Sequence, residues 1–248
     1  LMDLISIIIP YYKKKNYIID TINSALGQSY KKIEILIIYD DENHDDLKFL
    51  EKIKNEDERI RLVINKKKMG AGISRNIGIS NSTGNYIAFL DADDTWHTDK
   101  LNKQMSFMIN NNYLVSHTSY QIVDEKKNII GNRIARNFND VKDLLKSCDI
   151  GTSTVILKKD IFSEDIKFPS IKTKEDFVLW LRILKTNTKI YGLNNNLMMW
   201  RKSNSSLSSS TIQKLLDGFR VYNKYMKFNF VKSIYYLICL SLNFLIKK

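Results

Sequence analysis

The chain of 248 residues contains little cysteine, proline or glycine, with 2, 2 and 9 residues respectively. Cys148 and Cys239 lie far apart, so neither a disulfide framework nor a Cys-x-x-Cys metal site is predicted, and a reducing cytoplasm is the expected compartment. So few prolines and glycines do not supply the frequent turns that a sandwich or barrel of short strands requires. Longer helices between strands are expected instead.

Long hydrophobic runs are also missing. The apolar start from Leu1 to Pro10 lacks the basic residues and the small-residue cleavage site of a signal peptide, and it is predicted to be a buried strand that ends at Pro10. The longest uncharged run, Ser233 to Ile246, has 14 residues, whereas a helix needs about 20 to span a bilayer. The sequence therefore predicts no transmembrane segment.

Negative charge is in deficit, with 27 acidic against 39 basic residues and a net charge of +12. Nucleic acid, an anionic membrane face and a phosphate-bearing substrate all suit such a charge, as does a simply solvated surface. A nucleic-acid-binding protein is expected to cluster its basic residues among aromatics and to lack acidic strand ends. Because acidic residues follow two predicted strands, nucleic acid is not an expected partner.

Hydrophobic periodicity predicts alternating strands and helices over the first 94 residues. The expected strands are 4–9, 33–39, 60–64 and 86–90, and the expected helices are 17–26, 47–53 and 72–80. This alternation is typical of an α/β fold with a mostly parallel sheet flanked by helices, in which ligands bind at the carboxyl ends of the strands. Later elements are expected at 100–110, 115–123, 153–157 and 174–184, followed by a C-terminal helical tail with Ile212, Leu215, Leu216, Phe219, Tyr222 and Met226 on one face.

Two motifs follow predicted strands. Asp91, Asp93 and Asp94 are close enough to repel one another unless a cation neutralises them, and Mn²⁺ or Mg²⁺ would suit carboxylate oxygens; a solvated acidic turn or a helix cap is the alternative. The segment 69–78 opens a helix, but Arg75 stands where a dinucleotide fingerprint has its third glycine. Arg75 could reach a base or a phosphate, or it could be an ordinary surface residue.

Together these motifs resemble the family 2 glycosyltransferases. Segment 6–12 resembles the start of that family, segment 34–41 its second strand with an Asp-Asp turn, segment 70–78 its Gly-x-x-x-x-Arg-Asn-x-Gly helix, and segment 84–94 its Asp-x-Asp strand. Order and spacing agree over about the first 105 residues. The resemblance implies a GT-A, Rossmann-like fold and an inverting, metal-dependent transfer from a UDP-sugar to a saccharide hydroxyl. It also implies an acceptor that is a lipid-linked glycan in surface polysaccharide biosynthesis.

The resemblance also implies roles for single residues. Pro10 and Tyr12 would border the nucleoside, Asp40 would accept from the uracil N–H, Arg75 would face the base or diphosphate, Asp91 the ribose or sugar, and Asp93 the Mn²⁺ or Mg²⁺ cofactor. Two departures stand out. The usual Asp-Asp-Gly-Ser turn is Asp-Asp-Glu-Asn at 40–43, and Lys13 stands where asparagine is frequent.

The second half offers a candidate base and a further phosphate ligand. Glu175 and Asp176 resemble the Glu-Asp pair of the family, which implies that Asp176 is the general base; alternatively, Thr173 and Asp176 match a capping box. Segment 200–206 resembles a stretch in which an arginine and often a histidine face the diphosphate. Arg201 is present, whereas Ser203 replaces the histidine, and a flexible basic loop is the other interpretation.

The expected organisation is a nucleotide-sugar-binding half at 1–94, an acceptor-binding half of the same domain at 95–206, and a tail at 207–248. Apolar residues including Ile234, Ile238, Phe244 and Leu245, flanked by lysines at 227, 232, 247 and 248, predict a tail on the inner face of the cell membrane. Packing on the catalytic domain or on a second copy in a homodimer is the alternative. A non-catalytic scaffold of this fold and a nucleic-acid-binding protein are the competing functions.

Overall fold

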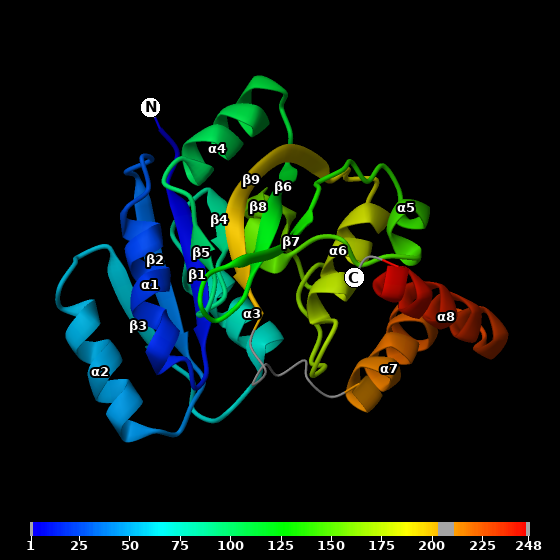
Figure 1. Cartoon of the computed structure of the whole chain (residues 1–248), viewed down its shortest axis with the longest axis horizontal. Coiled ribbons are helices and arrows are strands. Elements are labelled where there is room, and N and C mark those ends of the chain that lie inside the picture. Colours follow the sequence, from blue (N-terminus) through cyan, green and yellow to red (C-terminus); the bar gives the residue numbers. More distant parts are fainter. Residues whose placement is uncertain (1, 203–210, 247–248) are drawn as a thin grey trace.

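The computed structural model describes residues 2–202 and 211–246, except for the side chains of 244–246. Over these residues it contains a nine-stranded mixed sheet with helices on both faces (Figure 1), in the order β3-β2-β1-β4-β8-β6-β9-β5, with β7 paired to β6. The strands are β1 (Ile5–Tyr11), β2 (Ile33–Tyr39), β3 (Ile60–Ile64), β4 (Tyr86–Phe89), β5 (Thr95–Trp96), β6 (Val115–Val123), β7 (Ile129–Arg133), β8 (Ile156–Lys158) and β9 (Tyr191–Arg201). The helices are α1 (Lys15–Leu26), α2 (His44–Lys54), α3 (Ala71–Asn81), α4 (Lys100–Asn110), α5 (Val141–Leu145), α6 (Glu175–Lys185), α7 (Thr211–Arg220) and α8 (Phe230–Ile246).

The first four strands pair with one another in parallel, as the sequence predicts, and β6 and β9 form a further parallel pair. Successive side chains of a strand point to opposite faces, so Ile7 and Ile9 pack with α1, α2 and α4, while Ile8 packs with α3 and α6. Helix α3 can approach β1 closely because Gly78 has no side chain. A Cβ at this position would lie only 2.5 Å from Ile8 Cγ2. This packing holds the start of α3 at the carboxyl edge of the sheet.

Two predicted strand boundaries are wrong. Strand β1 continues through Pro10 to Tyr11, because β4 pairs with β1 only as far as Ile8 and Pro10 lies beyond the ladder on that side. The strand predicted at 153–157 starts as a 3₁₀ turn, Thr152–Thr154, since the Thr154 hydroxyl donates to the Gly151 carbonyl (2.6 Å). Strands β5, β7 and β9 and helix α5 were not predicted.

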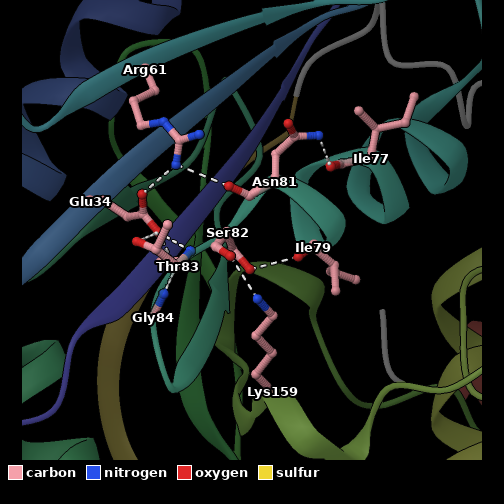
Figure 2. Close-up of polar contacts among 10 residues, drawn as sticks. Glu34, Arg61, Ile77, Ile79, Asn81, Ser82, Thr83, Gly84 and Lys159 are labelled. Carbon is pink, nitrogen blue, oxygen red and sulfur yellow. Dashed lines mark hydrogen bonds and ion pairs between the residues drawn. The ribbon is translucent and has the colours of Figure 1, made fainter.

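The amino ends of the parallel strands are held by a buried carboxylate, at the opposite edge from the candidate site. Glu34 of β2 accepts hydrogen bonds from the Ser6 hydroxyl, from the backbone and hydroxyl of Thr83, and from Arg61 (2.8 Å), as Figure 2 shows in part. In the same turn, Lys159 donates to the Ser82 carbonyl (2.6 Å). These bonds fix the connection from α3 to β4, because they satisfy its polar groups inside the protein.

The tail packs beside α5 and α6 at one end of the molecule (Figure 1). Helix α7 passes through a π-helical turn, Val221–Tyr225, before α8 begins. The single apolar face predicted for this segment is wrong: Tyr222 is buried, whereas Ile212 and Leu216 are exposed. The wider π-helical turn changes the angular spacing of side chains, so the faces before and after it no longer coincide. Within the described part of the chain, no helix has the length and hydropathy needed to cross a membrane.

Candidate active site

The carboxyl ends of β1, β2 and β4 open into a cleft of about 800 Å³. Because these strands are parallel neighbours, the residues that follow each of them meet at one edge of the sheet. The cleft is lined by all eight residues singled out in the sequence: Pro10, Tyr12, Asp40, Arg75, Asp91, Asp93, Asp176 and Arg201. Candidate groups from both halves of the chain therefore face one cavity.

Asp40 anchors the loop that leads into α3. Its Oδ1 accepts from the Asn65 side-chain amide and the Met69 backbone N–H, and its Oδ2 accepts from the Gly70 N–H, each at 2.7 Å. Gly70 has a φ of +86°, which favours glycine at this turn. A carboxylate offers about four acceptor positions, so one position on Oδ2 is left for a donor group such as an imide N–H.

Tyr12 and Lys68 face each other on the same side of the cleft. The Lys68 ammonium donates to the Tyr12 hydroxyl (2.6 Å) and lies 3.8 Å from the centroid of its ring. The hydrogen bond from Lys68 lowers the pKa of Tyr12. Lys68 belongs to the lysine run after β3, so this run supplies a cation at the mouth of the cleft.

Arg75 joins three separate elements. Its guanidinium donates to Asp91 Oδ1 (2.6 Å), which follows β4, and to Glu175 Oε1 (2.8 Å) at the start of α6. Arg75 is 3% exposed, so the alternative of an ordinary surface residue is wrong. Its Nε is buried and has no partner among the described atoms. Two of its five N–H donors are thus committed to carboxylates of the protein, and the Nε–H is a buried donor without a described partner.

The acidic strand end is neutralised in part by the protein itself. The Lys14 ammonium lies 2.7 Å from Asp93 Oδ2, and Arg75 neutralises Asp91. Asp94 is 2% exposed and accepts from the Ser153 hydroxyl (2.6 Å) and the Arg201 backbone N–H (3.1 Å). Burial, followed by the charges of Asp93 and Asp91, raises the pKa of Asp94 well above its ordinary value. Asp94 is therefore a structural group, and the alternative of a solvated acidic turn is wrong.

A divalent cation is compatible with this donor set. Among the described residues no cluster of three or more His, Cys, Asp or Glu side chains could hold a metal alone. The Asp93 carboxylate lines the cleft and offers hard oxygen ligands, although its Oδ2 is also paired with the Lys14 ammonium. Mg²⁺ commonly binds through one or two carboxylates together with substrate phosphates, and a site of this kind needs only Asp93 from the protein.

Asp176 lies where the cleft meets a second cavity of about 250 Å³, which we call the side chamber. The Thr152 hydroxyl donates to its Oδ2 (3.2 Å), and the Phe177 N–H donates to its Oδ1 (2.7 Å). The predicted capping box is not formed, because the Thr173 hydroxyl donates to Asp217 (3.0 Å). The residue that caps α6 is Lys174, which has a left-handed backbone (φ +66°) and lines both cavities.

Glu175 differs from its neighbour Asp176 in its environment. Its carboxylate is bound to Arg75, and its side chain is 13% exposed. Burial raises the pKa of Glu175 to about 6, with a further contribution from the charge of Asp176, although Arg75 acts in the opposite direction. Glu175 is held as a partner of Arg75, so Asp176 is the carboxylate of this pair that is available at the junction of the cavities.

Arg201 closes the cleft from the end of β9. Its Nε donates to the Asp93 carbonyl (3.1 Å), and its NH2 group lies 3.4 Å from Asp20 Oδ2. It is 6% exposed and ordered by these contacts, so the alternative of a flexible basic loop is wrong for Arg201 itself. Ser203, which stands in place of the family histidine, lies outside the described residues.

Sequence reasoning missed several groups of the cleft. Lys14, Lys68 and Thr152 carry no motif of their own, and only their position beside a predicted site residue could have indicated them. Of the described residues that line the cleft, eight are cationic and five are carboxylates, an excess of positive charge that suits a diphosphate.

Comparison with known proteins gives consistent results. Residues 6–164 match the family model described as glycosyl transferase family 2. The chain is 35% identical over 95% of its length to WfgD of Escherichia coli and covers 91% of that protein. It is 36% identical over 99% of its length to WfaP of Escherichia coli and covers 96% of it. Both relatives are named UDP-Glc:alpha-D-GlcNAc-diphosphoundecaprenol beta-1,3-glucosyltransferases.

A solved structure with the same fold is that of TarS residues 1–349 from S. aureus, in complex with UDP-GlcNAc. The superposition has a TM-score of 0.74 at 19% identity and covers 94% of this chain and 70% of the TarS chain. The predicted fold class is thereby confirmed: a GT-A type α/β fold with a C-terminal helical segment.

Proposed function

This chain belongs to glycosyl transferase family 2, and we propose that it is an inverting enzyme that transfers a sugar from a UDP-sugar to a hydroxyl of a lipid-linked saccharide. The observation that carries the proposal is the convergence of all eight candidate residues on one cleft, with Asp176 at its junction with the side chamber. Two relatives of similar length are named for UDP-glucose as donor and a diphosphoundecaprenol-linked sugar as acceptor.

In the proposed donor complex the nucleoside lies between the ends of β1 and β2. Pro10 and Tyr12 border it, and the remaining acceptor position of Asp40 receives the uracil imide N–H. Asp91 faces the ribose or the sugar, held in orientation by Arg75. The Arg75 side chain lines the cleft, and its guanidinium would face the base or the diphosphate. Fixed donors and acceptors of this kind lower the free energy of the transition state because they need no reorganisation.

The leaving diphosphate lies beside Asp93, Lys14 and Arg201. A divalent cation, Mn²⁺ or Mg²⁺, would be held by Asp93 and would supply charge stabilisation to the departing diphosphate. Lys14 contacts Asp93 directly, and the guanidinium of Arg201 donates to the Asp93 carbonyl, so both cations lie next to the carboxylate that would carry the metal.

The proposed general base is Asp176. In an inverting transfer, the acceptor hydroxyl attacks the anomeric carbon as the diphosphate leaves, and a carboxylate takes the hydroxyl proton. Asp176 faces the cleft on one side and the side chamber on the other, so an acceptor hydroxyl entering through the chamber would meet it. Thr152 and the start of α6 hold the carboxylate in that orientation.

The test is transfer by the purified chain with Mn²⁺, with UDP-, GDP- and dTDP-sugars as donors and a GlcNAc-diphosphoryl alkyl lipid as acceptor. Mass spectrometry should detect a disaccharide lipid with a UDP-sugar, UDP-glucose being the first to try, and NMR should give an anomeric configuration opposite to that of the donor. Retention of configuration would overturn the inverting mechanism. If none of the donors yields product or free nucleotide, while the chain remains folded, the alternative of a non-catalytic scaffold holds.

A further inference from the structure

Helix α8 has two different faces. Val231, Tyr235, Ile238 and Leu242 are 76%, 51%, 53% and 53% exposed, whereas Leu240 is 7% exposed. At 3.6 residues per turn, each residue advances by about 100°, so the four exposed residues form one stripe that lies roughly opposite Leu240. We call these four residues the outer stripe. A continuous apolar stripe on a helix surface typically marks a surface that contacts a partner.

The buried face of the same helix borders the candidate site. Leu240 and Asn243 line the side chamber, together with Asp176. The Asn243 side chain donates to the Lys146 carbonyl (3.0 Å), which ties α8 to the segment after α5. Helix α8 is thus a single layer between the side chamber and the surroundings of the protein.

The segment that contains the outer stripe carries basic residues and no acidic ones. Asp217 is the last acidic residue of the chain, and the 31 residues after it contain six lysines and arginines. Lys224, Lys227 and Lys232 are exposed at the start of α8, and the Lys146 ammonium lies 5.9 Å from the Tyr235 ring. Apolar side chains bordered by lysines are the combination by which a helix lies in the interface of an anionic membrane.

We propose that the outer stripe docks on the surface of an anionic lipid bilayer, so that the side chamber lies one helix away from the head group of a membrane-bound acceptor. The inference rests on the proposed function, because the bilayer matters only if the acceptor is lipid-linked. A symmetric dimer through the same stripe would bring the two sets of lysines together, and like charges in an interface cost free energy. The charge pattern therefore favours lipid over a second copy of this chain.

The test is flotation of the full chain with vesicles of phosphatidylcholine, alone or with phosphatidylglycerol. The double variant Ile238→Ser with Leu242→Ser should lower the partition coefficient by at least about tenfold, since two apolar side chains that would insert into the bilayer are replaced by polar ones. A matched control is Ile109→Ser with Leu114→Ser. These residues are also exposed, but they lie at and beyond α4, on another side of the molecule (Figure 1). The control should bind vesicles like the unmodified chain.

A second variant, Lys224→Gln with Lys227→Gln and Lys232→Gln, should lose binding only where phosphatidylglycerol is present, and salt should weaken binding of the unmodified chain. Transfer to an acceptor in vesicles should fall in both variants, whereas transfer to a water-soluble acceptor and stabilisation by UDP should be retained. If UDP does not stabilise the unmodified chain, the proposed function is contradicted, and the docking proposal is not. The docking proposal is overturned if the unmodified chain does not bind vesicles of either composition. It is also overturned if light scattering shows a dimer that is absent in the variant Ile238→Ser with Leu242→Ser.

Discussion

The carboxylate of Asp176 differs in its partners from Asp91, Asp93 and Glu175 of the same cleft. Asp91 and Glu175 are bound to Arg75, and Asp93 is bound to Lys14. Asp176 accepts only from a hydroxyl and a backbone N–H in the described structure. No described ammonium or guanidinium group occupies this carboxylate, so it is left to accept a hydrogen bond from the acceptor hydroxyl, as a general base requires.

The variant Asp176→Asn should therefore lower kcat by about 10²- to 10⁴-fold, because the amide preserves shape but cannot accept the proton. The dissociation constant for UDP, measured by calorimetry, should remain near that of the unmodified chain. Asp99→Asn is a suitable control, since Asp99 is exposed and its side chain does not cap α4. Unchanged turnover per folded molecule would show that Asp176 has only a structural role.

Asp93 is the residue on which the proposed metal site depends. Asp93→Ala should abolish detectable transfer and weaken Mn²⁺ binding in the presence of UDP, which electron paramagnetic resonance of the free ion measures directly. Asp41→Ala is the control, because Asp41 follows the neighbouring strand β2 and does not line the cleft. Full activity of the unmodified chain in excess EDTA would contradict metal dependence and would assign the neutralising role to Lys14 and Arg201.

At the scale of elements, helix α7 holds the loop that precedes α6, the helix that carries the proposed base. Asp217 is fully buried and accepts from the Thr173 backbone and hydroxyl (both 3.0 Å), Gln213 (2.9 Å) and Arg220 (2.9 Å). Thr173 directly precedes the residue that caps α6. The tail is thereby joined to Thr173, which lies three residues before Asp176 in the sequence.

Asp217→Ala should lower the free energy of unfolding by about 1–3 kcal/mol, because buried donors of Thr173 lose their acceptor. It should also lower kcat more than it changes UDP affinity, since the loop at the base loses its anchor. Gln213→Leu removes only one of the donors and serves as the control, with a loss below about 1 kcal/mol. Chemical denaturation measures the change in the free energy of unfolding, and steady-state kinetics measures kcat. An unchanged kcat in Asp217→Ala would show that the contact between α7 and Thr173 does not affect turnover.

The connection from α3 to β4 predicts a pH dependence. Burial by itself raises the pKa of Glu34, but the hydrogen bonds from Ser6, Thr83 and Arg61 outweigh it and lower the pKa from 4.5 to about 2. A carboxyl whose pKa is depressed by folding stabilises the fold above its unfolded pKa, and this contribution disappears as the pH falls. The free energy of unfolding should therefore decrease between about pH 5 and pH 2.

The variant Glu34→Gln should be less stable at pH 7 and should show a flatter pH dependence over that acidic range. Urea denaturation at several pH values gives the comparison, with Glu164→Gln as the control, because Glu164 is highly exposed. Identical slopes for Glu34→Gln and the unmodified chain would show that Glu34 does not carry the acid sensitivity.

At the scale of the whole molecule, donor binding should stabilise the fold as a unit. The cleft is built from both halves of one continuous sheet, so a ligand there contacts elements on both sides. A ligand at 100 times its dissociation constant adds about 2.7 kcal/mol, which corresponds to a rise in Tm of about 5–10 °C for a chain of this size. UDP with Mn²⁺ should produce this rise in a thermal-shift assay. A control with AMP should not, and equal shifts with both nucleotides would contradict selectivity for uridine.

Much of this architecture follows from local patterns. Branched apolar runs predicted the four parallel strands, and the motif residues after them predicted a site at the carboxyl edge, because parallel strands end together. Elements with mixed or polar sequences, such as β7 and β9, escaped prediction since they are stabilised by pairing with β6 rather than by their own periodicity.

The candidate residues could be named from the resemblance of the motifs to the family, and all eight line one cleft, but their partners depended on folding. Arg75 meets Glu175 across 100 positions, and Lys14 meets Asp93, because the sheet and α6 bring them within hydrogen-bond distance. Hydrophobic periodicity predicts which face of a helix or strand is buried, but it does not predict which distant side chain packs against that face. For the same reason the sequence showed that the tail is apolar and basic, while its packing on the domain left Val231, Tyr235, Ile238 and Leu242 at the surface.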